Sequence, residues 1–325
     1  MKTLNRIFLM IVAMAASFVV ASCSNDNTVN EAQDASQGIT TRAVGTKTPK
    51  FTAYIETNDI NPLNAGEYYF TGTNPHEEVI DHVILFASNI RGTASSVQLY
   101  HNPNQTYILN NINTLVKPLQ NKGIKVLLGL LGDHTGVGFA NLTNKNIAAG
   151  DSLLNDFAYQ VANCVTTYGL DGVDFDDEYA EYGKISGTPT PSTNNFGLLI
   201  QKVRELLPDK LITAFDYGGY TGFNQTTMNA ISYMWPNFGC SSNPPSGLPK
   251  SKWAKLSLHY TSGWPTCDQI QNCASSYNGY GAVMSFNLRN YDCSGTMNCF
   301  APYVWGGRTV SYTCLLYTSP SPRDA

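Results

Sequence analysis

Residues 170–178 read LDGVDFDDE, a run in which acidic residues alternate with apolar ones. Successive side chains of a β-strand point to opposite faces, so a strand here sorts its residues into two sets. The apolar set is Val173 and Phe175, and the acidic set is Asp174, Asp176 and Glu178. The apolar face predicts contact with a layer of helices. The acidic face is then expected inside a barrel, climbing toward its C-terminal mouth, with Asp177 on the outward or loop side.

Further candidate strands flank this run and are separated by longer stretches with helical spacing. The strand candidates are 51–55, 79–87, 125–131, 172–176, 211–217, 231–235, 256–260 and 282–287. Between them, residues 107–122, 147–168 and 195–207 carry apolar side chains three and four residues apart, so each has an apolar stripe to lay on a sheet. Most central strands are apolar on both faces, as parallel strands under helices should be. The pattern predicts an α/β fold, a (β/α)8 TIM barrel.

The first 22 residues are predicted to be a lipoprotein signal peptide outside the fold. Two basic residues precede an apolar run of about fifteen residues, which is the pattern of a secretory leader. Residues 19–23 resemble a bacterial lipobox, so Cys23 is the expected lipidation site; ordinary cleavage nearby, with a spare thiol, is the alternative. Residues 23–48 read as a flexible tether. We therefore expect export and a lipid anchor at the outer membrane or cell surface, or else a periplasmic or secreted protein.

The other end of the chain looks foreign. Residues 314–325 resemble a translated sequencing adapter and are predicted to be a scar. Residues 49–313 remain, about the size of one TIM barrel. Because the adapter would replace the native end, we expect the last helix of the barrel to be missing through truncation.

Composition excludes some functions. The net charge is −4 and no basic stripe is present, which argues against nucleic-acid binding, and we expect a monomer. Cys164 lies in a helical pattern and is expected to be buried. The pairs 267/273 and 293/299 are close in sequence and suggest local disulfides, although other pairings stay open. Since no CxxC spacing or histidine cluster occurs, neither a metal site nor a cofactor is expected.

Three carboxylates on one face of a strand suggest catalysis. Like charges this close cannot all ionise, so at least one pKa must rise. A carboxylic acid that stays protonated near neutral pH can protonate a leaving oxygen, as glycoside hydrolysis requires. A metal site would favour ligands spread over a loop, and a solvated acidic turn would not be flanked by large apolar residues. The run therefore predicts the active site of a glycoside hydrolase.

The run also carries a specific resemblance. Residues 171–178 match the DGxDxDxE signature of glycoside hydrolase family 18, and the longer string 168–183 resembles the endo-β-N-acetylglucosaminidase H/F1 branch. Similar text recurs at 53–58, 123–128, 132–141 and 285–288, so the resemblance covers about residues 51 to 292. It implies cleavage of the β-1,4 bond in the di-N-acetylchitobiose core of N-linked glycans, with high-mannose or hybrid glycans as the expected partners.

The resemblance also implies a role for each acid. Family 18 lets the substrate supply its own nucleophile, in contrast to two-carboxylate glycosidases. Glu178 is implied to protonate the leaving oxygen and later to activate water. Asp176 is implied to hold the acetamide N–H, and Asp174 to tune Asp176 through a shared proton.

Further site residues are expected around the mouth. Where the branch usually has a tyrosine after strand six, this chain has Asn237 and Phe238, so one of these is expected to face the acetamide. Trp235 is predicted to form the floor of the sugar site by stacking, with filling of the barrel top as the alternative. The remaining predicted substrate-binding residues are Asp171, His134, Tyr217 and Asn287, with a loop-stabilising hydrogen bond as the alternative role of His134. His259 is expected in the barrel core.

Two other functions remain open. A chitinase acting on GlcNAc polymers shares the core signature, but residues 179–183 favour the glycan-releasing branch. A glycan-binding barrel without activity is the third hypothesis, and Glu178 argues against it because such barrels lose the glutamate.

Overall fold

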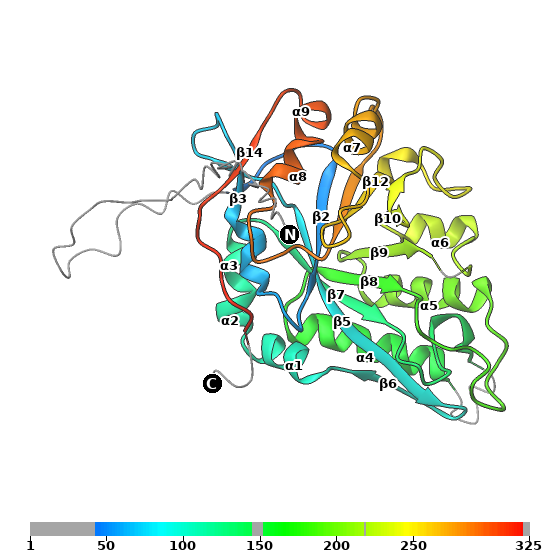
Figure 1. The fold of residues 1–325 in the computed structure, drawn as a ribbon. Coiled ribbons are helices and arrows are strands. Elements are labelled where there is room, and N and C mark those ends of the chain that lie inside the picture. The colour runs from blue at the N-terminus through cyan, green and yellow to red at the C-terminus, as the bar shows by residue number, and fades with distance from the viewer. Residues whose placement is uncertain (1–42, 145–151, 218, 321–325) are drawn as a thin grey trace, which may run out of the picture. The chain divides into compact units, whose positions relative to one another are not determined.

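The computed structural model describes residues 43–144, 152–217 and 219–320, so the predicted leader and Cys23 lie outside it. Parallel strands run through the centre of this part (Figure 1). Their bounds are β2 (Lys50–Glu56), β5 (His82–Thr93), β7 (Lys125–Leu131), β8 (Gly172–Asp176), β9 (Leu211–Asp216), β10 (Tyr233–Pro236), β12 (Ala254–His259) and β13 (Ala282–Phe286). Each strand overlaps a range expected from the sequence.

The strands close into a barrel. Neighbours pair in the order β10-β9-β8-β7-β5-β2-β13-β12, and a parallel bridge from Met234 to Trp253 joins the two ends. Two short strands extend the sheet in antiparallel fashion: β6 (Ser96–Tyr100) pairs with β5, and β11 (Gly239–Cys240) pairs with β12. The predicted (β/α)8 barrel is confirmed.

Helices α4, α5 and α6 lie along the outside of the strands (Figure 1). The helices of the described residues are α1 (Pro103–Asn110), α2 (Ile112–Leu115), α3 (Lys117–Asn121), α4 (Leu153–Thr167), α5 (Thr193–Leu206), α6 (Gln225–Ala230), α7 (Cys267–Ala274), α8 (Ser294–Asn298) and α9 (Ala301–Val304). The apolar stripes of α4 and α5 are buried, as their spacing predicts. No helix in these ranges is both long enough and apolar enough to cross a bilayer.

A smaller sheet adds a second layer of strands. It joins β1 (Ala43–Val44), β4 (Glu77–Glu78), β3 (Tyr68–Phe70) and β14 (Val310–Tyr312). Between β13 and β14 the chain forms α8 and α9, and the Phe300 ring packs edge-on against Phe51 of β2 at 5.3 Å. Two short helices thus follow the eighth strand, and the loss of a further helix through truncation stays a prediction.

The segment expected to be a scar lies against the barrel as far as it is described. Tyr317 donates its backbone N–H to Asn64 Oδ1 at 2.6 Å, and Asn61 Nδ2 donates to the Thr318 carbonyl at 3.1 Å. Both asparagines belong to or cap the 3-10 helix η1 (Pro62–Glu67). These contacts do not test the origin of the segment, which stays a prediction.

The disulfides differ from the local pairs that the spacing suggested. Two disulfides between described residues join Cys240 to Cys273 and Cys267 to Cys299. Cys267 and Cys273 are the first and seventh residues of α7, so their side chains point to different sides of the helix and cannot meet. Instead, each joins α7 to a neighbouring segment. Cys164 is free and buried, as expected, and Cys293 is also free.

Candidate active site

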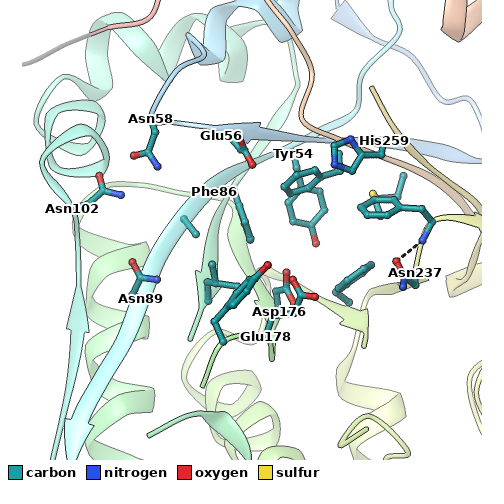
Figure 2. Close-up of a pocket in the computed structure, with 17 residues that line it drawn as sticks. Tyr54, Glu56, Asn58, Phe86, Asn89, Asn102, Asp176, Glu178, Asn237 and His259 are labelled. Atoms are coloured by element: carbon teal, nitrogen blue, oxygen red, sulfur yellow. Dashed lines mark hydrogen bonds between the residues drawn. The ribbon is translucent and has the colours of Figure 1, made fainter. Parts of the chain in front are cut away.

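The carboxyl ends of the barrel strands open into a cavity of about 530 Å³ (Figure 2). Aromatic side chains in its wall are Tyr54, Phe86, Tyr179, Phe215, Phe238 and Phe286. Polar side chains in its wall are Glu56, Asn58, Asn89, Asn102, Asp176, Glu178, Asn237 and His259. In Figure 2 the carboxylates lie between one group of amides (Asn58, Asn89, Asn102) and another polar pair (Asn237, His259). Rings and amides together are suited to the faces and hydroxyls of a sugar.

Asp174 lies at the bottom of the acidic face and is completely buried. Its two oxygens accept hydrogen bonds from the hydroxyls of Tyr54 at 2.7 Å and Thr213 at 2.6 Å. Burial raises the pKa of Asp174 to about 6, against the effect of these two hydrogen bonds. The charge of Asp174 raises the pKa of Asp176, and the shared proton expected from the sequence stays a prediction.

Asp176 is the last residue of β8 and lies between the other two acids of the inward face. It is 4 % exposed, and its Oδ1 atom has no hydrogen-bond partner among the described residues. Burial raises the pKa of Asp176 well above its ordinary value, and the charges of Glu178, Asp174 and Asp177 raise it further. A ligand that donates one hydrogen bond here would satisfy this oxygen.

Glu178 follows β8 and lines the same cavity as Asp176. The side chain is partly exposed, and partial burial raises its pKa. The neutral acid is therefore favoured over a wider pH range than for a solvated glutamate. A partly buried acid at the mouth of a cavity, next to a buried carboxylate, fits the role of a proton donor.

Asp177 points away from the cavity, as strand alternation predicts. It is 6 % exposed, and its Oδ1 atom accepts a hydrogen bond from the Tyr182 hydroxyl at 2.5 Å. Burial raises the pKa of Asp177 to about 7, while hydrogen bonds from Tyr182 and the Phe139 backbone oppose the rise.

Trp235 does not form the floor of the pocket. Its exposed fraction is 0 %, and its indole N–H donates to the Tyr54 hydroxyl at 2.8 Å. The ring packs edge-on against Tyr54 inside the barrel. The stacking prediction is therefore wrong, because Trp235 fills the barrel and supports the Tyr54–Asp174 pair from behind. Asn237 and Phe238, two and three residues on, do line the cavity, as expected.

Asp171 lies at the opposite end of the barrel from the cavity, because it precedes the first residue of β8. Its carboxylate accepts hydrogen bonds from the Val126 backbone at 3.0 Å and from Gln120 at 2.8 Å, and it pairs with Lys125. The prediction that Asp171 binds substrate is wrong. The residue instead ties the start of β8 to β7.

Three other residues that were predicted to contact substrate lie behind or beside the residues that line the cavity. His134 is exposed, and its Nδ1 atom lies 2.8 Å from the Glu181 carboxylate, which makes it a loop-stabilising residue. Tyr217 is 41 % exposed and stacks on Phe215, because the chain turns directly after β9. Asn287 is buried and donates to Glu56 Oε2 at 3.1 Å, so it supports a residue of the lining. None of the three is among the residues that line the cavity, so direct contact with substrate stays a prediction for each.

Sequence reasoning missed several residues of the lining. Glu56 ends β2 and Asn58 follows it, Asn89 lies within β5, and Asn102 lies between β6 and α1. A signal was present for the first two, because polar residues at the carboxyl end of a strand lie where barrel enzymes react. His259 ends β12 and lines the cavity, so its expected place in the core was wrong. In the described ranges no cluster of His, Cys, Asp and Glu could hold a metal ion.

Known proteins resemble this chain in both sequence and structure. Residues 51–235 match the model of glycosyl hydrolases family 18. The chain is 35% identical over 265 residues to the endo-beta-N-acetylglucosaminidase of Flavobacterium sp. (strain SK1022), a match that covers 79% of this chain and 81% of that protein. It is 34% identical over 297 residues to endo-beta-N-acetylglucosaminidase F1 of Elizabethkingia meningoseptica, with 86% and 84% of the two chains covered.

A solved structure agrees with the sequence relatives. EndoBT-3987 of Bacteroides thetaiotaomicron, determined with Man5GlcNAc product, superimposes with a TM-score of 0.72 at 28% identity, over 86% of this chain and 67% of that one. The acidic run on β8, the barrel around it and these matches lead to one conclusion. The chain belongs to family 18 of the glycosyl hydrolases.

Proposed function

We propose that this chain is an endo-β-N-acetylglucosaminidase that cleaves the β-1,4 bond in the di-N-acetylchitobiose core of N-linked glycans. The main support is the buried Asp176 Oδ1 atom. It has no hydrogen-bond partner among the described residues, and Asp176 lines the cavity together with Glu178. Two relatives bear the name of this activity, and EndoBT-3987 has also been determined with a Man9GlcNAc2Asn substrate.

The reaction begins with Glu178. Its carboxylic acid protonates the glycosidic oxygen as the bond to the anomeric carbon breaks. The carbonyl oxygen of the 2-acetamido group attacks the same carbon and forms an oxazolinium ion. Water, deprotonated by the Glu178 carboxylate, then opens this ion, so two inversions give net retention.

Asp176 acts on the acetamide. Before substrate binds, burial and neighbouring charges disfavour its ionised form. The acetamide N–H supplies the missing hydrogen-bond donor, so bound substrate stabilises the carboxylate. That negative charge then offsets the positive charge that develops on the oxazolinium ion. Electrostatic stabilisation of this kind is often the largest single contribution to catalysis.

Asp174 and its partners form a buried group below Asp176, and the charge of Asp174 raises the Asp176 pKa. Trp235, Tyr54 and Asp174 form a chain of hydrogen bonds in which each donor is buried. Asn237, in the cavity wall, replaces the tyrosine usual in this branch as a donor to the acetamide carbonyl. Its Oδ1 atom accepts from the Phe238 backbone at 2.8 Å, which restrains the side chain.

The glycan is proposed to be of the high-mannose or hybrid type. Asn58, Asn89 and Asn102 present amide groups on one side of the cavity, and Glu56 adds a carboxylate to its wall (Figure 2). Mannose hydroxyls are matched by such groups, because each amide or carboxylate can bind two adjacent hydroxyls.

The enzyme is further proposed to act as an exported monomer that is anchored through lipid at Cys23. The Cys23→Ser substitution would then release the protein into the soluble fraction.

One assay separates this function from its alternatives. The protein and its Glu178→Gln variant are incubated with a high-mannose glycoprotein and, separately, with chitin oligomers. We expect the wild type to release glycan from the glycoprotein and the variant to be inactive. Cleavage of chitin oligomers alone would identify a chitinase, and glycan binding without turnover would identify a binding barrel.

A further inference from the structure

Two loops run side by side at the mouth of the barrel. The loop after β7 donates three backbone hydrogen bonds to the loop after β8. These run from Gly132 to the Glu178 carbonyl at 3.0 Å, from His134 to Tyr179 at 2.7 Å and from Gly136 to Ala180 at 2.8 Å. The pairing of β7 with β8 thus continues past the ends of both strands and holds the backbone of Glu178.

Glycines allow this close approach. A Cβ atom on Gly132 would lie 2.2 Å from the Glu178 carbonyl oxygen, and one on Gly138 would lie 2.5 Å from Ala180 Cβ. Neither distance is compatible with a side chain unless the loop after β8 moves. The loops are therefore built to lie against each other.

Tyr182 fastens the far side of the same loop. Its hydroxyl donates to Asp177 Oδ1 at 2.5 Å and accepts from the backbone N–H of Ala140 at 2.9 Å. Ala140 belongs to the 3-10 helix η2 (Phe139–Asn141), which is buried. Asp177 immediately precedes Glu178, so one hydroxyl ties the residue before the acid to a rigid part of the barrel.

Glu178 depends on this backbone support. Within the described residues no side-chain hydrogen bond is made to its carboxyl group, and the group lies beyond the last residue of β8. A proton donor must stay within hydrogen-bond reach of the oxygen that it protonates. The direction in which the Glu178 carboxyl points is therefore set by the backbone of the loop rather than by neighbouring side chains.

We propose that Tyr182 and Asp177 are positioning residues, whose hydrogen bond on the outward side of the loop keeps the Glu178 carboxyl aimed at the glycosidic oxygen. This inference rests on the proposed function, since it assumes that Glu178 is the proton donor. It assigns a purpose to the one acid of the run 174–178 that faces away from the cavity.

The leaving group distinguishes positioning from general damage to the fold. A sugar hydroxyl leaves only if it is protonated, whereas a nitrophenolate leaves with little help. The probes are a high-mannose glycopeptide and the 4-nitrophenyl glycoside of the same glycan with one GlcNAc. We expect Tyr182→Phe to lower kcat about tenfold on the glycopeptide, since general acid catalysis contributes about 100-fold or more. On the nitrophenyl glycoside kcat should fall less than about twofold, with KM nearly unchanged on both.

Tyr220→Phe is the matched control. The Tyr220 ring packs edge-on against Tyr182 at 5.4 Å, so this variant removes a neighbouring hydroxyl and leaves the loop hydrogen bonds in place. We expect both rates to match the wild type. Asp177→Ala should repeat the Tyr182→Phe pattern, and Asp177→Asn should show a smaller loss on the glycopeptide because its amide oxygen still accepts from Tyr182.

Equal losses on the two probes, or no loss with Tyr182→Phe, would overturn the inference while leaving the proposed function intact. A wild type that cleaves neither probe would overturn the proposed function, and the inference with it. If Tyr182→Phe fails to fold, as judged by its melting temperature, the comparison of Asp177→Asn with Asp177→Ala decides the same question.

Discussion

Replacing Asp177 by asparagine should stabilise the protein at alkaline pH. The carboxyl group is buried, and its pKa rises from an ordinary value of 3.8 to about 7 in the folded state. The folded protein therefore binds this proton more tightly than the unfolded chain does. By linkage, the free energy of unfolding falls as the pH rises from the ordinary pKa to the raised one.

The size of the effect follows from the shift. Each pKa unit corresponds to about 1.4 kcal/mol, so a shift of roughly three units costs about 4 kcal/mol above the raised pKa. The asparagine side chain in Asp177→Asn would remain neutral, and its amide oxygen would still accept from Tyr182. The variant should exceed the wild type by less than about 1 kcal/mol near pH 4 and by about 4 kcal/mol near pH 8.

Denaturant unfolding at several pH values between these limits measures the difference. Asp209→Asn serves as the control, because Asp209 is exposed and the same change of charge is made there without burial. A difference between wild type and Asp177→Asn that stays constant with pH, or a variant that is less stable at alkaline pH, would contradict the raised pKa of Asp177.

Three further predictions use the same structure. The raised pKa of Glu178 predicts that kcat/KM falls as the pH rises through it, since only the protonated acid can act; a pH profile without an alkaline limb would contradict this. Asn237→Ala should lower kcat/KM about tenfold if its amide binds the acetamide, since a lost hydrogen bond costs about 1.4 kcal/mol, and unchanged kinetics would exclude that contact. Replacing Cys267 and Cys299 by alanine opens a loop of 32 residues and should lower the free energy of unfolding by about 3–4 kcal/mol; calorimetry showing an unchanged melting temperature would contradict this.

The sequence predicted features that depend on local periodicity. Alternation along β8 correctly separated the inward acids from Asp177, because the two-residue period of a strand leaves no other choice once one face is apolar. The other strand candidates were recognisable as short apolar runs between stretches with helical spacing. The position of Asn237 and Phe238 in the cavity wall was expected from the family resemblance, which places a tyrosine after strand six.

Features that depend on contacts between distant segments were not predictable in this way. Asn58, Asn89 and Asn102 look like ordinary loop and cap residues until the barrel brings their segments together. Trp235 is recognised as a filler only when Tyr54, far away in sequence, accepts its N–H. The disulfide pairing was not predictable either, because two cysteines that are close in sequence can lie on different sides of one helix.

The residues of one sequence signature need not lie at the same end of the barrel, because a strand runs from one end to the other. Asp171 belongs to the same motif as Glu178, yet it lies at the other end of β8 and bonds to the β7 backbone. Residues of one motif that are separated by the length of a strand serve different ends of a barrel. Only those at the carboxyl end reach the reaction.

The central claim is tested most directly by the mass of the peptide that remains after digestion of a high-mannose glycopeptide. We expect wild-type protein to leave a single N-acetylglucosamine on the asparagine and Glu178→Gln to leave the glycan whole. A peptide that keeps its full glycan with the wild type, or loses every sugar including the innermost one, would contradict the claim.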